Sequence, residues 1–525
     1  MSMSTIKPRF SQRLIFTGTL RTLCPLHIGG LDWALHTDMA LTRDVLGRPF
    51  LPGSSIAGML RAACDGDIAK VLFGFSDVNE ANSGHASRVF VDDAKLIGPG
   101  NITLIDHVRI DRTTGVAAAQ ARFDLEALDA NTCFAFRAVL ELGAAQSAVL
   151  AEFMGVLCQL SNSELSLGRG TQRGYGELKL EGLMIERQDF SSVAGILAAL
   201  SKTLKPVPEP ATNSAVLKTL HITVRFEQSG PLMLKASHEG VEINMLPRTA
   251  NGLHGKHALI LPGSSIKGAF RSHAERIVRS LLNVDDSVDD TPLIDVLFGV
   301  ARTGSGKRTG ASANSAQAEK SATAGVLRFK TLYASNGHSD AWLALAKSAS
   351  EASEKDVLLS PHYKALKAAH LRADKAQPQV DIAYHVAIDR FTGGAADKML
   401  YTAVEPWHTQ WPPLEISLDY GVLEQRLKLR GYQDPAAAAQ AAQVLLLHLL
   451  NDFCNGEIAL GFASTRGYGA VSAQPGAVQF TGPANHALTL DKTLDAALKV
   501  GSNAQSLMAA AWTNYLTTAK SGAQQ

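Results

Sequence analysis

The sequence predicts an α+β protein made of two tandem copies of one domain, and the main reason is an internal repeat. The segment LPGSSIAGMLR at residues 51–61 returns as LPGSSIKGAFR at residues 261–271. Leu72-Phe73-Gly74 follows the first copy, and Leu297-Phe298-Gly299 follows the second. A repeat has to be recognised before single elements are assigned, because it defines the unit that folds.

Two further pairs of segments keep the same order along the chain. HVRIDRTTG at residues 107–115 matches HVAIDRFTG at residues 385–393. LGRGTQRGYG at residues 167–176 matches LGFASTRGYG at residues 460–469. Collinear matches of this kind indicate a tandem duplication.

Composition gives the domain boundaries. Residues 201–217 hold three prolines among small and polar residues, which is typical of a linker. We expect a first repeat at 1–200, the linker at 201–217, a second repeat at 218–484 with insertions near 301–325 and 341–377, and a C-terminal helical extension at 485–525. The first insertion is rich in Ala, Gly, Ser, Thr and Lys and should be disordered, whereas the Ala- and Lys-rich second should be helical.

Hydrophobic periodicity predicts the elements of the first repeat. They are a strand at 13–23, a helix at about 54–73, a strand at 104–110, a strand at 133–142, a helix at 146–160 and a strand at 177–185. Their order is that of a ferredoxin-like domain. The second repeat begins with a strand at 218–227 and has its second helix at 435–453.

Bulk composition argues against a strongly basic protein, a disulfide framework, a structural zinc site and a membrane span. The chain has 525 residues, 46% apolar and 19% charged, with a net charge of +1, so any nucleic-acid contact must come from local patches. Its five cysteines are far apart, which argues against disulfides and structural zinc and fits a reducing cytosol. No apolar run has membrane-spanning length, so we expect a cytoplasmic protein with no membrane partner.

The repeated Pro-Gly-Ser-Ser segment predicts a turn that enters a helix with a serine cap. Free N–H groups and the helix dipole make such an end suitable for an anion. Arg61, Lys267 and Arg271 follow one or two turns later and could contact a phosphate. The alternative is an ordinary capped core helix.

The two glycine-rich loops predict a close approach of the backbone to a ligand. Arg169, Arg173 and Arg466 could reach phosphates, and Tyr175 and Tyr468 could stack on a base or sugar. The alternative is a pair of tight turns with solvated arginines.

Taken together, the motifs resemble those of the RAMP superfamily, and more narrowly the backbone subunits of type III CRISPR effector complexes, here with two units fused in one chain. They are the turn His27-Ile28-Gly29-Gly30, the Pro-Gly-Ser-Ser helix, the Ile-Asp-Arg segment and the glycine loop. The resemblance covers most of residues 13–185 and, more loosely, 218–480. It implies binding to a crRNA, to a paired single-stranded target RNA and to other CRISPR-associated subunits.

The resemblance also implies a β-hairpin "thumb" that interrupts pairing, with cleavage of the target opposite the interruption. Residues 111–121 lack the large apolar side chains needed to join a core, so an exposed hairpin is expected there. Residues 389–397 are the counterpart. The thumb candidates are Asp111, Arg112, Asp389 and Arg390.

By the same resemblance, the catalytic aspartate lies in the loop between the His27–Gly30 turn and the Pro-Gly-Ser-Ser helix. Asp38 fits that position, where a carboxylate could accept a proton from a 2′-hydroxyl or hold a divalent ion, Mg²⁺ or Mn²⁺. Asp32 and His36 are weaker candidates, and a solvated loop acid is the alternative for all three. His27, Arg43 and Arg248 are further candidates for RNA contacts.

The second repeat departs from this pattern. The segment Ser229–Leu232 stands where the histidine turn is expected and has no histidine. Aligning Met245 with Met39 places Asn244 opposite Asp38, and a neutral amide cannot act as a base. A slip of one residue would leave Glu242 as a substitute.

We therefore expect a crRNA-binding subunit that cleaves its paired target as a metal-dependent endoribonuclease, with the active site in the first repeat. One alternative is a non-catalytic filament subunit. The other is a standalone endonuclease that processes crRNA, which would need a histidine-centred acid–base site.

Overall fold

The computed structural model describes residues 10–30, 37–64, 66–76, 84–111, 117–143, 147–201, 206, 219–236, 244–251, 257–282, 292–300, 323–335, 379–407, 409–482, 493–499 and 503–523. The disorder expected at 301–325 and the helix expected at 341–377 lie outside these residues, except for 323–325. Of the expected linker, only Ser201 and Pro206 are described.

The chain divides into two compact units. The first consists of Met1–Ile110, Ala117–Thr171 and Tyr175–Val216. The second consists of Leu217–Gln525 together with the short segments Asp111–Val116 and Gln172–Gly174.

An antiparallel sheet forms the centre of the first unit, with the strand order β10-β1-β9-β6-β2 and β5 also paired to β9. Its strands are β1 (Gln12–Thr22), β2 (Phe50–Leu51), β5 (Val89–Val91), β6 (Ala94–Ile97), β9 (Cys133–Leu142) and β10 (Leu178–Asp189). Alternate residues of β1, including Phe16 and Leu20, are fully buried, as expected for a strand with one face on a core. Phe16 lies opposite Ala138 and Leu20 opposite Phe134 in the register of β1 and β9.

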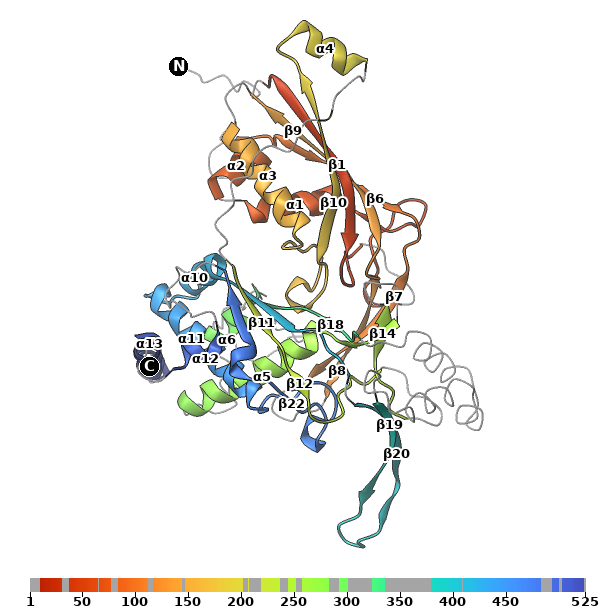
Figure 1. Cartoon of the computed structure of the whole chain (residues 1–525), viewed down its shortest axis with the longest axis vertical. Helices are drawn as coiled ribbons and strands as arrows, with labels where there is room; N and C mark the ends of the chain where they lie inside the picture. Colours follow the sequence, from red (N-terminus) through yellow and green to blue (C-terminus); the bar gives the residue numbers. More distant parts are fainter. Residues whose placement is uncertain are drawn as a thin grey trace, which may run out of the picture. The chain divides into compact units, whose positions relative to one another are not determined.

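Helices cover one face of this sheet (Figure 1). They are α1 (Gly53–Ala63), α2 (Gly66–Phe73) and α3 (Ser147–Ser161). The ring of Phe153 on α3 packs edge-on against Phe16, with 5.2 Å between ring centroids. The single helix expected at 54–73 is two helices, because Cys64 adopts an extended conformation (φ −83°, ψ 157°) that ends α1.

Further short elements complete the first unit. They are β3 (Phe75–Ser76), β4 (Gly84–His85), the hairpin β7 (Ile102–Ile110) with β8 (Ala117–Leu128), and α4 (Val193–Leu200). The 3-10 turn Thr171–Arg173 lies in the glycine loop.

The second unit has a four-stranded antiparallel sheet with the order β17-β21-β11-β23. Its strands are β11 (Thr219–Val224), β17 (Leu327–Phe329), β21 (Leu414–Asp419) and β23 (Val478–Thr481). In chain order these are the first, second, third and fourth main strands, and they lie side by side as 2-3-1-4. The strands β6, β9, β1 and β10 of the first unit have the same arrangement.

Among the described residues, the helices of the second unit are α5 (Gly263–Leu282), α6 (Pro292–Phe298), α10 (Tyr420–Leu429), α11 (Pro435–Cys454), α12 (Leu494–Ala497) and α13 (Asn503–Ala523). Its short elements are β12 (Glu227–Gln228), β13 (Thr249–Asn251), β14 (His257–Leu261), β15 (Gly299–Val300), β16 (Thr323–Ala324), β18 (Leu332–Tyr333) and β22 (Val471–Ser472), with 3-10 turns at Ser464–Arg466 and Pro475–Ala477. Phe270 on α5 packs against Phe329 and Phe453, with 5.2 and 5.5 Å between ring centroids. Helices α12 and α13 lie in the region where the C-terminal extension is expected.

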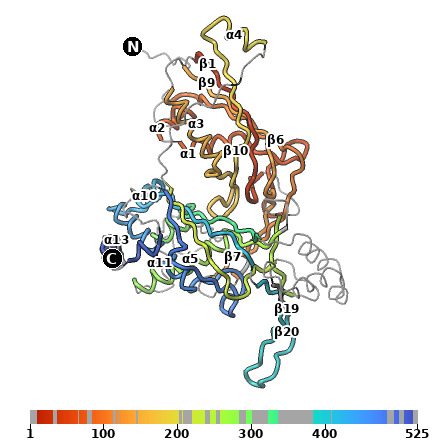
Figure 2. The backbone as a smooth tube through the Cα atoms, viewed as in Figure 1, coloured from red at the N-terminus to blue at the C-terminus, as the bar shows by residue number. Residues whose placement is uncertain are grey.

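A long hairpin, β19 (Gln379–Ile388) with β20 (Ala395–Trp407), projects from the second unit (Figure 2). It is longer than the expected arm at 389–397, which forms only its tip. Next to the first expected arm, β7 and β8 pair from Ile102 and Leu128 to Ile110 and Ala117, whereas residues 112–116 of the arm lie outside the described residues.

The starts of α1 and α5 differ from the expected serine caps. The N-cap of α1 is Pro52, and no side chain caps it through a hydrogen bond. The carboxylate of Asp93 instead accepts a hydrogen bond from the N–H of Gly53 (2.7 Å), and Thr331 Oγ1 does so for Gly263 (3.1 Å). An acid already occupies the end of α1, so that end is a poor site for a phosphate.

Two general expectations concern cysteines and membranes. All five cysteines are among the described residues, and none forms a disulfide. Within the described chain, no helix combines the length and apolar character needed to cross a bilayer.

Candidate functional site

The segment around Asp38 is held against strand β8 by a reciprocal pair of hydrogen bonds. The N–H of Asp38 donates to Asp124 Oδ1 (2.8 Å), and the N–H of Asp124 donates to Asp38 Oδ2 (3.0 Å). Thr37 Oγ1 also donates to Asp124 Oδ1 (2.8 Å). We call these contacts the Asp38–Asp124 pair. Asp38 itself is exposed, so the pair fixes the direction of an accessible carboxylate.

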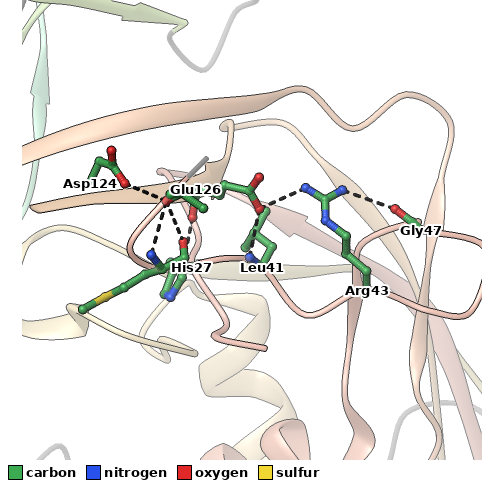
Figure 3. Close-up of polar contacts among 8 residues, drawn as sticks. His27, Leu41, Arg43, Gly47, Asp124 and Glu126 are labelled. Carbon is green, nitrogen blue, oxygen red and sulfur yellow. Dashed lines mark hydrogen bonds and ion pairs between the residues drawn. The ribbon is translucent and has the colours of Figure 1, made fainter. Parts of the chain in front are cut away.

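Glu126, two residues further along β8, holds the next part of the same segment (Figure 3). Its N–H donates to the carbonyl of Met39 (3.0 Å), and its Oε2 accepts from the N–H of Leu41 (3.0 Å) and from Arg43 Nη2 (2.9 Å). Its carbonyl accepts from Nδ1 of His27 (2.7 Å). Arg43 therefore serves an ion pair inside the unit, in addition to any role toward RNA.

The second unit repeats this arrangement with different residues. Asn244 donates its N–H to Thr402 Oγ1 (3.3 Å), and the N–H of Thr402 donates to Asn244 Oδ1 (3.0 Å). The N–H of Val404 donates to the carbonyl of Met245 (3.0 Å), as the N–H of Glu126 does to Met39. Asn244 thus occupies the position of Asp38, in agreement with the alignment made from the sequence.

The predicted counterpart of the His27–Gly30 turn in the second unit, Ser229–Leu232, is wrong. The carbonyl of His27 accepts from the N–H of Arg169 (2.9 Å), and the carbonyl of Met233 accepts from the N–H of Phe462 (2.8 Å). Met233, and not a residue of Ser229–Leu232, is therefore the counterpart of His27. The sequence alignment was out of place here because the turn and the glycine loop are joined by backbone hydrogen bonds, which leave no signature in the sequence. The second unit still lacks a histidine at this position.

His27 does not present its ring for RNA contact. Its exposed fraction is 2%, and burial lowers its pKa, helped by the nearby Arg169 guanidinium and opposed by the bond to Glu126. Because a carbonyl only accepts, Nδ1 carries the proton in the neutral ring. The structure gives His27 a role in joining the turn to β8.

The glycine loops have the backbone geometry that their composition predicts. Gly168 and Gly461 have φ of +86° and +85°, and Gly176 and Gly469 have +76° and +73°. A Cβ on Gly176 would collide with the carbonyl oxygen of Leu167. These glycines are needed for the close return of the loop on itself, whatever the loop binds.

The two loop tyrosines are buried, so the expectation that they stack on RNA does not fit the structure. Tyr175 is 7% exposed, and its OH lies 3.1 Å from Nε2 of His107 on β7. Tyr468 is 5% exposed, and its OH lies 2.7 Å from Nε2 of His385 on β19. Both tyrosines join a glycine loop to the base of a hairpin.

The second unit adds a carboxylate to this contact. Tyr468 donates its OH to Glu405 Oε1, and His385 Nε2 lies 3.3 Å from the same oxygen. Glu405 is 8% exposed. Burial and the Glu405 carboxylate raise the pKa of Tyr468.

Lys267 is buried and Arg271 is partly buried and ion-paired, contrary to the expectation that they contact phosphate. Lys267 is 5% exposed and donates from Nζ to the carbonyl of Leu327 (2.7 Å). Burial lowers its pKa to about 7, with a further contribution from nearby guanidinium groups. Arg271 pairs with Glu275 (2.8 Å) and Asp295 (3.4 Å). Their spacing on α5 directs both side chains into the unit.

The other arginines predicted to contact RNA lie at the surface. Arg61, Arg169, Arg173 and Arg466 are exposed, and Arg248 is partly exposed. Arg466 donates to the OH of Tyr401 (2.6 Å) and lies over its ring. These arginines remain candidates for contacts with the phosphates of the RNA backbone.

The thumb candidates are only partly described. Arg112 lies outside the described residues, and Asp111 ends the described part of the first hairpin. Asp389 Oδ1 accepts from the N–H of Phe391 (2.7 Å), which shapes the tip of the second hairpin, and Arg390 is exposed there.

The described residues do not by themselves form a metal site. Among them, no group of three His, Cys, Asp or Glu side chains is placed to hold an ion. Asp32, His36 and Glu242 lie outside the described residues. The divalent ion at Asp38 therefore stays a prediction.

Sequence reasoning missed Asp124, Glu126 and Glu405. A signal existed for the first two, because acids alternate with apolar residues in FDLEAL at 123–128 and so share one face of a strand. Glu405 has no such signal, since its burial depends on Tyr468 and His385 from distant segments.

Comparison with known proteins supports the duplicated architecture. The sequence matches the RAMP superfamily over residues 19–179 and 258–472, one region in each repeat and together more than half of the chain. A search of curated proteins gave no match. The chain is therefore a member of the RAMP superfamily, with two family regions in one polypeptide.

Proposed function

We propose that this protein is a crRNA-binding backbone subunit of a type III CRISPR complex, and that its first unit cleaves the paired target RNA at Asp38. Membership of the RAMP superfamily supports the RNA-binding part of this proposal. We further propose that both units are ferredoxin-like domains of the RNA-recognition type, since their four main strands share the order 2-3-1-4.

One observation supports the assignment of the active site above all others. A reciprocal pair of hydrogen bonds, each from a backbone N–H to a side-chain oxygen, holds Asp38 in the first unit and Asn244 in the second. The two units therefore differ in chemistry at a shared position. An ionised carboxylate accepts a proton, whereas a neutral amide is a poor base. The difference predicts one active unit and one inactive unit.

Asp38 can act on RNA through the oxygen that the chain leaves accessible. Oδ2 accepts the N–H of Asp124, and among the described residues no hydrogen bond involves Oδ1. A target nucleotide whose 2′-OH meets Oδ1 would lose its proton to the carboxylate as the 2′-oxygen attacks the adjacent phosphorus. The bond to the 5′-oxygen then breaks and this oxygen takes a proton from water, which leaves a 2′,3′-cyclic phosphate and a 5′-hydroxyl. A bound Mg²⁺ or Mn²⁺ would stabilise the leaving oxygen.

The surface arginines are proposed to bind the RNA backbone. Arg61 lies on α1, Arg169 and Arg173 on the first glycine loop, and Arg466 on the second, all exposed. Contacts of this kind recognise phosphates and not bases, so one protein can accept any guide sequence.

The experiment is a denaturing-gel map of end-labelled target RNA cut by the assembled complex. Asp38→Ala should remove one cut, with a rate loss of at least about 100-fold, while target affinity stays unchanged. Asn244→Ala is the matched control and should change no band.

Three other results would contradict the proposal. If Asp38→Ala leaves all cuts, the chain is a scaffold whose neighbours cleave. If Glu242→Ala removes a cut, the second unit is active. If the isolated protein cleaves free repeat RNA, it is a crRNA-processing enzyme.

A further inference from the structure

We propose that Asp124 is the positioning residue of the active site, which orients the Asp38 carboxylate without itself reacting. The inference rests on the proposed function of Asp38 and adds a second residue, from a different element, to that site. It assigns to hairpin β7–β8 a part in catalysis besides any contact with RNA.

The geometry restrains Asp38 from two sides. Its N–H donates to the side chain of Asp124, and its Oδ2 accepts from the backbone of Asp124. A carboxylate held at one oxygen by an N–H cannot rotate freely, so Oδ1 keeps one direction. Orientation of this kind matters because a displacement of about 1 Å can cost about 100-fold in rate.

The Asp124 side chain is the only removable part of this restraint. It accepts two hydrogen bonds at Oδ1, from the N–H of Asp38 and from the hydroxyl of Thr37. Replacing it with alanine leaves both donors exposed to water, where they can turn away. The segment nevertheless stays attached, because Glu126 still holds Met39 and Leu41. The effect should therefore be local to Asp38.

The second unit provides an internal comparison. Thr402 occupies the position of Asp124 and accepts the N–H of Asn244 through a neutral hydroxyl. The restraint thus exists in a unit that has no acid at either position. The hydrogen bond that restrains the segment requires only an acceptor, which indicates that the negative charge of Asp124 is not essential for it.

An alternative is that Asp124 reacts directly, as a base or a metal ligand. Asparagine separates the two roles. It keeps an oxygen that accepts the N–H of Asp38, but it removes the charge that a base or metal ligand needs. Alanine removes both.

The test compares Asp124→Ala, Asp124→Asn and Asp38→Ala in the assembled complex, with Thr402→Ala as the matched control in the second unit. Measured are the single-turnover rate of each cut and the affinity for the target. Asp124→Ala should slow the Asp38-dependent cut about 10- to 100-fold at unchanged affinity. Asp124→Asn should restore the rate to within about 3-fold of the unmodified complex, and Thr402→Ala should change no cut.

Hydrogen exchange of the same variants gives a readout that does not depend on activity. Asp124→Ala should speed exchange at the N–H of Asp38, whereas the N–H of Leu41, bonded to Glu126, should be unchanged. Asp124→Asn should exchange like the unmodified protein.

Each contrary outcome has a distinct meaning. If Asp124→Asn is as slow as Asp124→Ala, Asp124 reacts directly and the inference is overturned. If Asp124→Ala cleaves normally while Asp38→Ala does not, the inference fails and the proposed function stands. If Asp38→Ala cleaves normally, the proposed function fails and this inference fails with it.

Discussion

At the scale of single residues, the same side-chain type serves different purposes at repeated positions. Lys267 and Arg271 lie in the same motif as Arg61, yet Arg61 is exposed, Lys267 is buried and Arg271 is partly buried in an ion pair. The motif determines the backbone at the start of α1 and α5. Whether a side chain of the motif is buried or exposed depends on the elements packed against the helix. Lys267 reaches the carbonyl of Leu327 in β17, a strand distant in sequence.

A buried lysine with a lowered pKa predicts a stability that depends on pH. Its folded pKa is about 7, below the ordinary 10.5, so between these values the unfolded chain binds more protons and stability rises with pH. Below pH 7 the full cost of burying the charge applies. Lys267→Met should therefore stabilise the protein by about 1–3 kcal/mol at pH 6, and the gain should shrink as pH rises to 9.

Thermal unfolding at pH 6 and pH 9 checks this, with Arg61→Met as the control on an exposed site. A lower melting temperature for Lys267→Met at pH 6 would show that the bond to Leu327 outweighs the buried charge. An equal gain at both pH values would show that the charge has no part in the effect.

At the scale of elements, the base of each hairpin is where the functional segments meet. In the first unit, β8 holds the Asp38 segment, and His107 on β7 contacts the glycine loop through Tyr175. In the second, β20 and His385 make the equivalent contacts. The outer part of hairpin β7–β8 does not pack on these segments, because Val108 and Ile110 are 53% and 50% exposed.

The hairpins should therefore tolerate shortening. Val108 lies opposite Arg122, so a two-residue Asn-Gly turn can replace residues 109–121 without a change of register. The shortened complex should assemble and melt as before but cut the target at blurred positions or not at all. The matched control replaces residues 387–399 between Val386 and Leu400 in the second hairpin, where the cut made by the first unit should persist. Unchanged cut positions in the first variant would contradict a thumb role.

Regular elements were the easiest part of the fold to predict from sequence. The strand expected at 133–142 is β9, and the helix expected at 435–453 is α11 with one residue more. Phe134, Phe136, Ala138 and Leu140 alternate along β9, and α11 is a long segment rich in Ala and Leu. Strand β8 was not among the expected strands, although residues 123–128 alternate, because its first residues, Ala117–Ala119, have no alternation. Helix α4 was missed because it is an apolar segment with no core to face.

The candidate site was predictable only in part. Asp38 and Asn244 could be placed by motif order, since a duplication preserves spacing. The partners of Asp38 could not, because Asp124 is 86 residues away, and each of the two hydrogen bonds between them joins a backbone N–H to a carboxylate oxygen of the other residue. Burial of Tyr175 and Tyr468 was hidden for the same reason: a tyrosine in a glycine loop has the same sequence signature whether it faces solvent or a hairpin.

At the scale of the whole molecule, a net charge of +1 places RNA binding in local patches. Each arginine that neutralises a phosphate releases counterions, so Arg61→Ala and Arg169→Ala should each lower the slope of log affinity against log salt by about 0.7. Guide binding measured at several salt concentrations, with two unrelated guides, tests this. Lys267→Met is the control and should leave the slope unchanged, because its side chain is buried. A loss confined to one guide sequence would contradict backbone binding.

The duplication also gives the molecule its central asymmetry, which is a carboxylate in one unit and an amide at the same place in the other. Asp38→Asn tests this most directly, because it gives the first unit the residue of the second and keeps an oxygen that can accept the N–H of Asp124. The decisive measurement is the single-turnover cleavage map of a bound target by the complex with Asp38→Asn, beside Asn244→Asp. We predict that Asp38→Asn removes one cut at unchanged target affinity, and that Asn244→Asp leaves this cut in place. Cleavage by Asp38→Asn at the original rate and position would contradict the account.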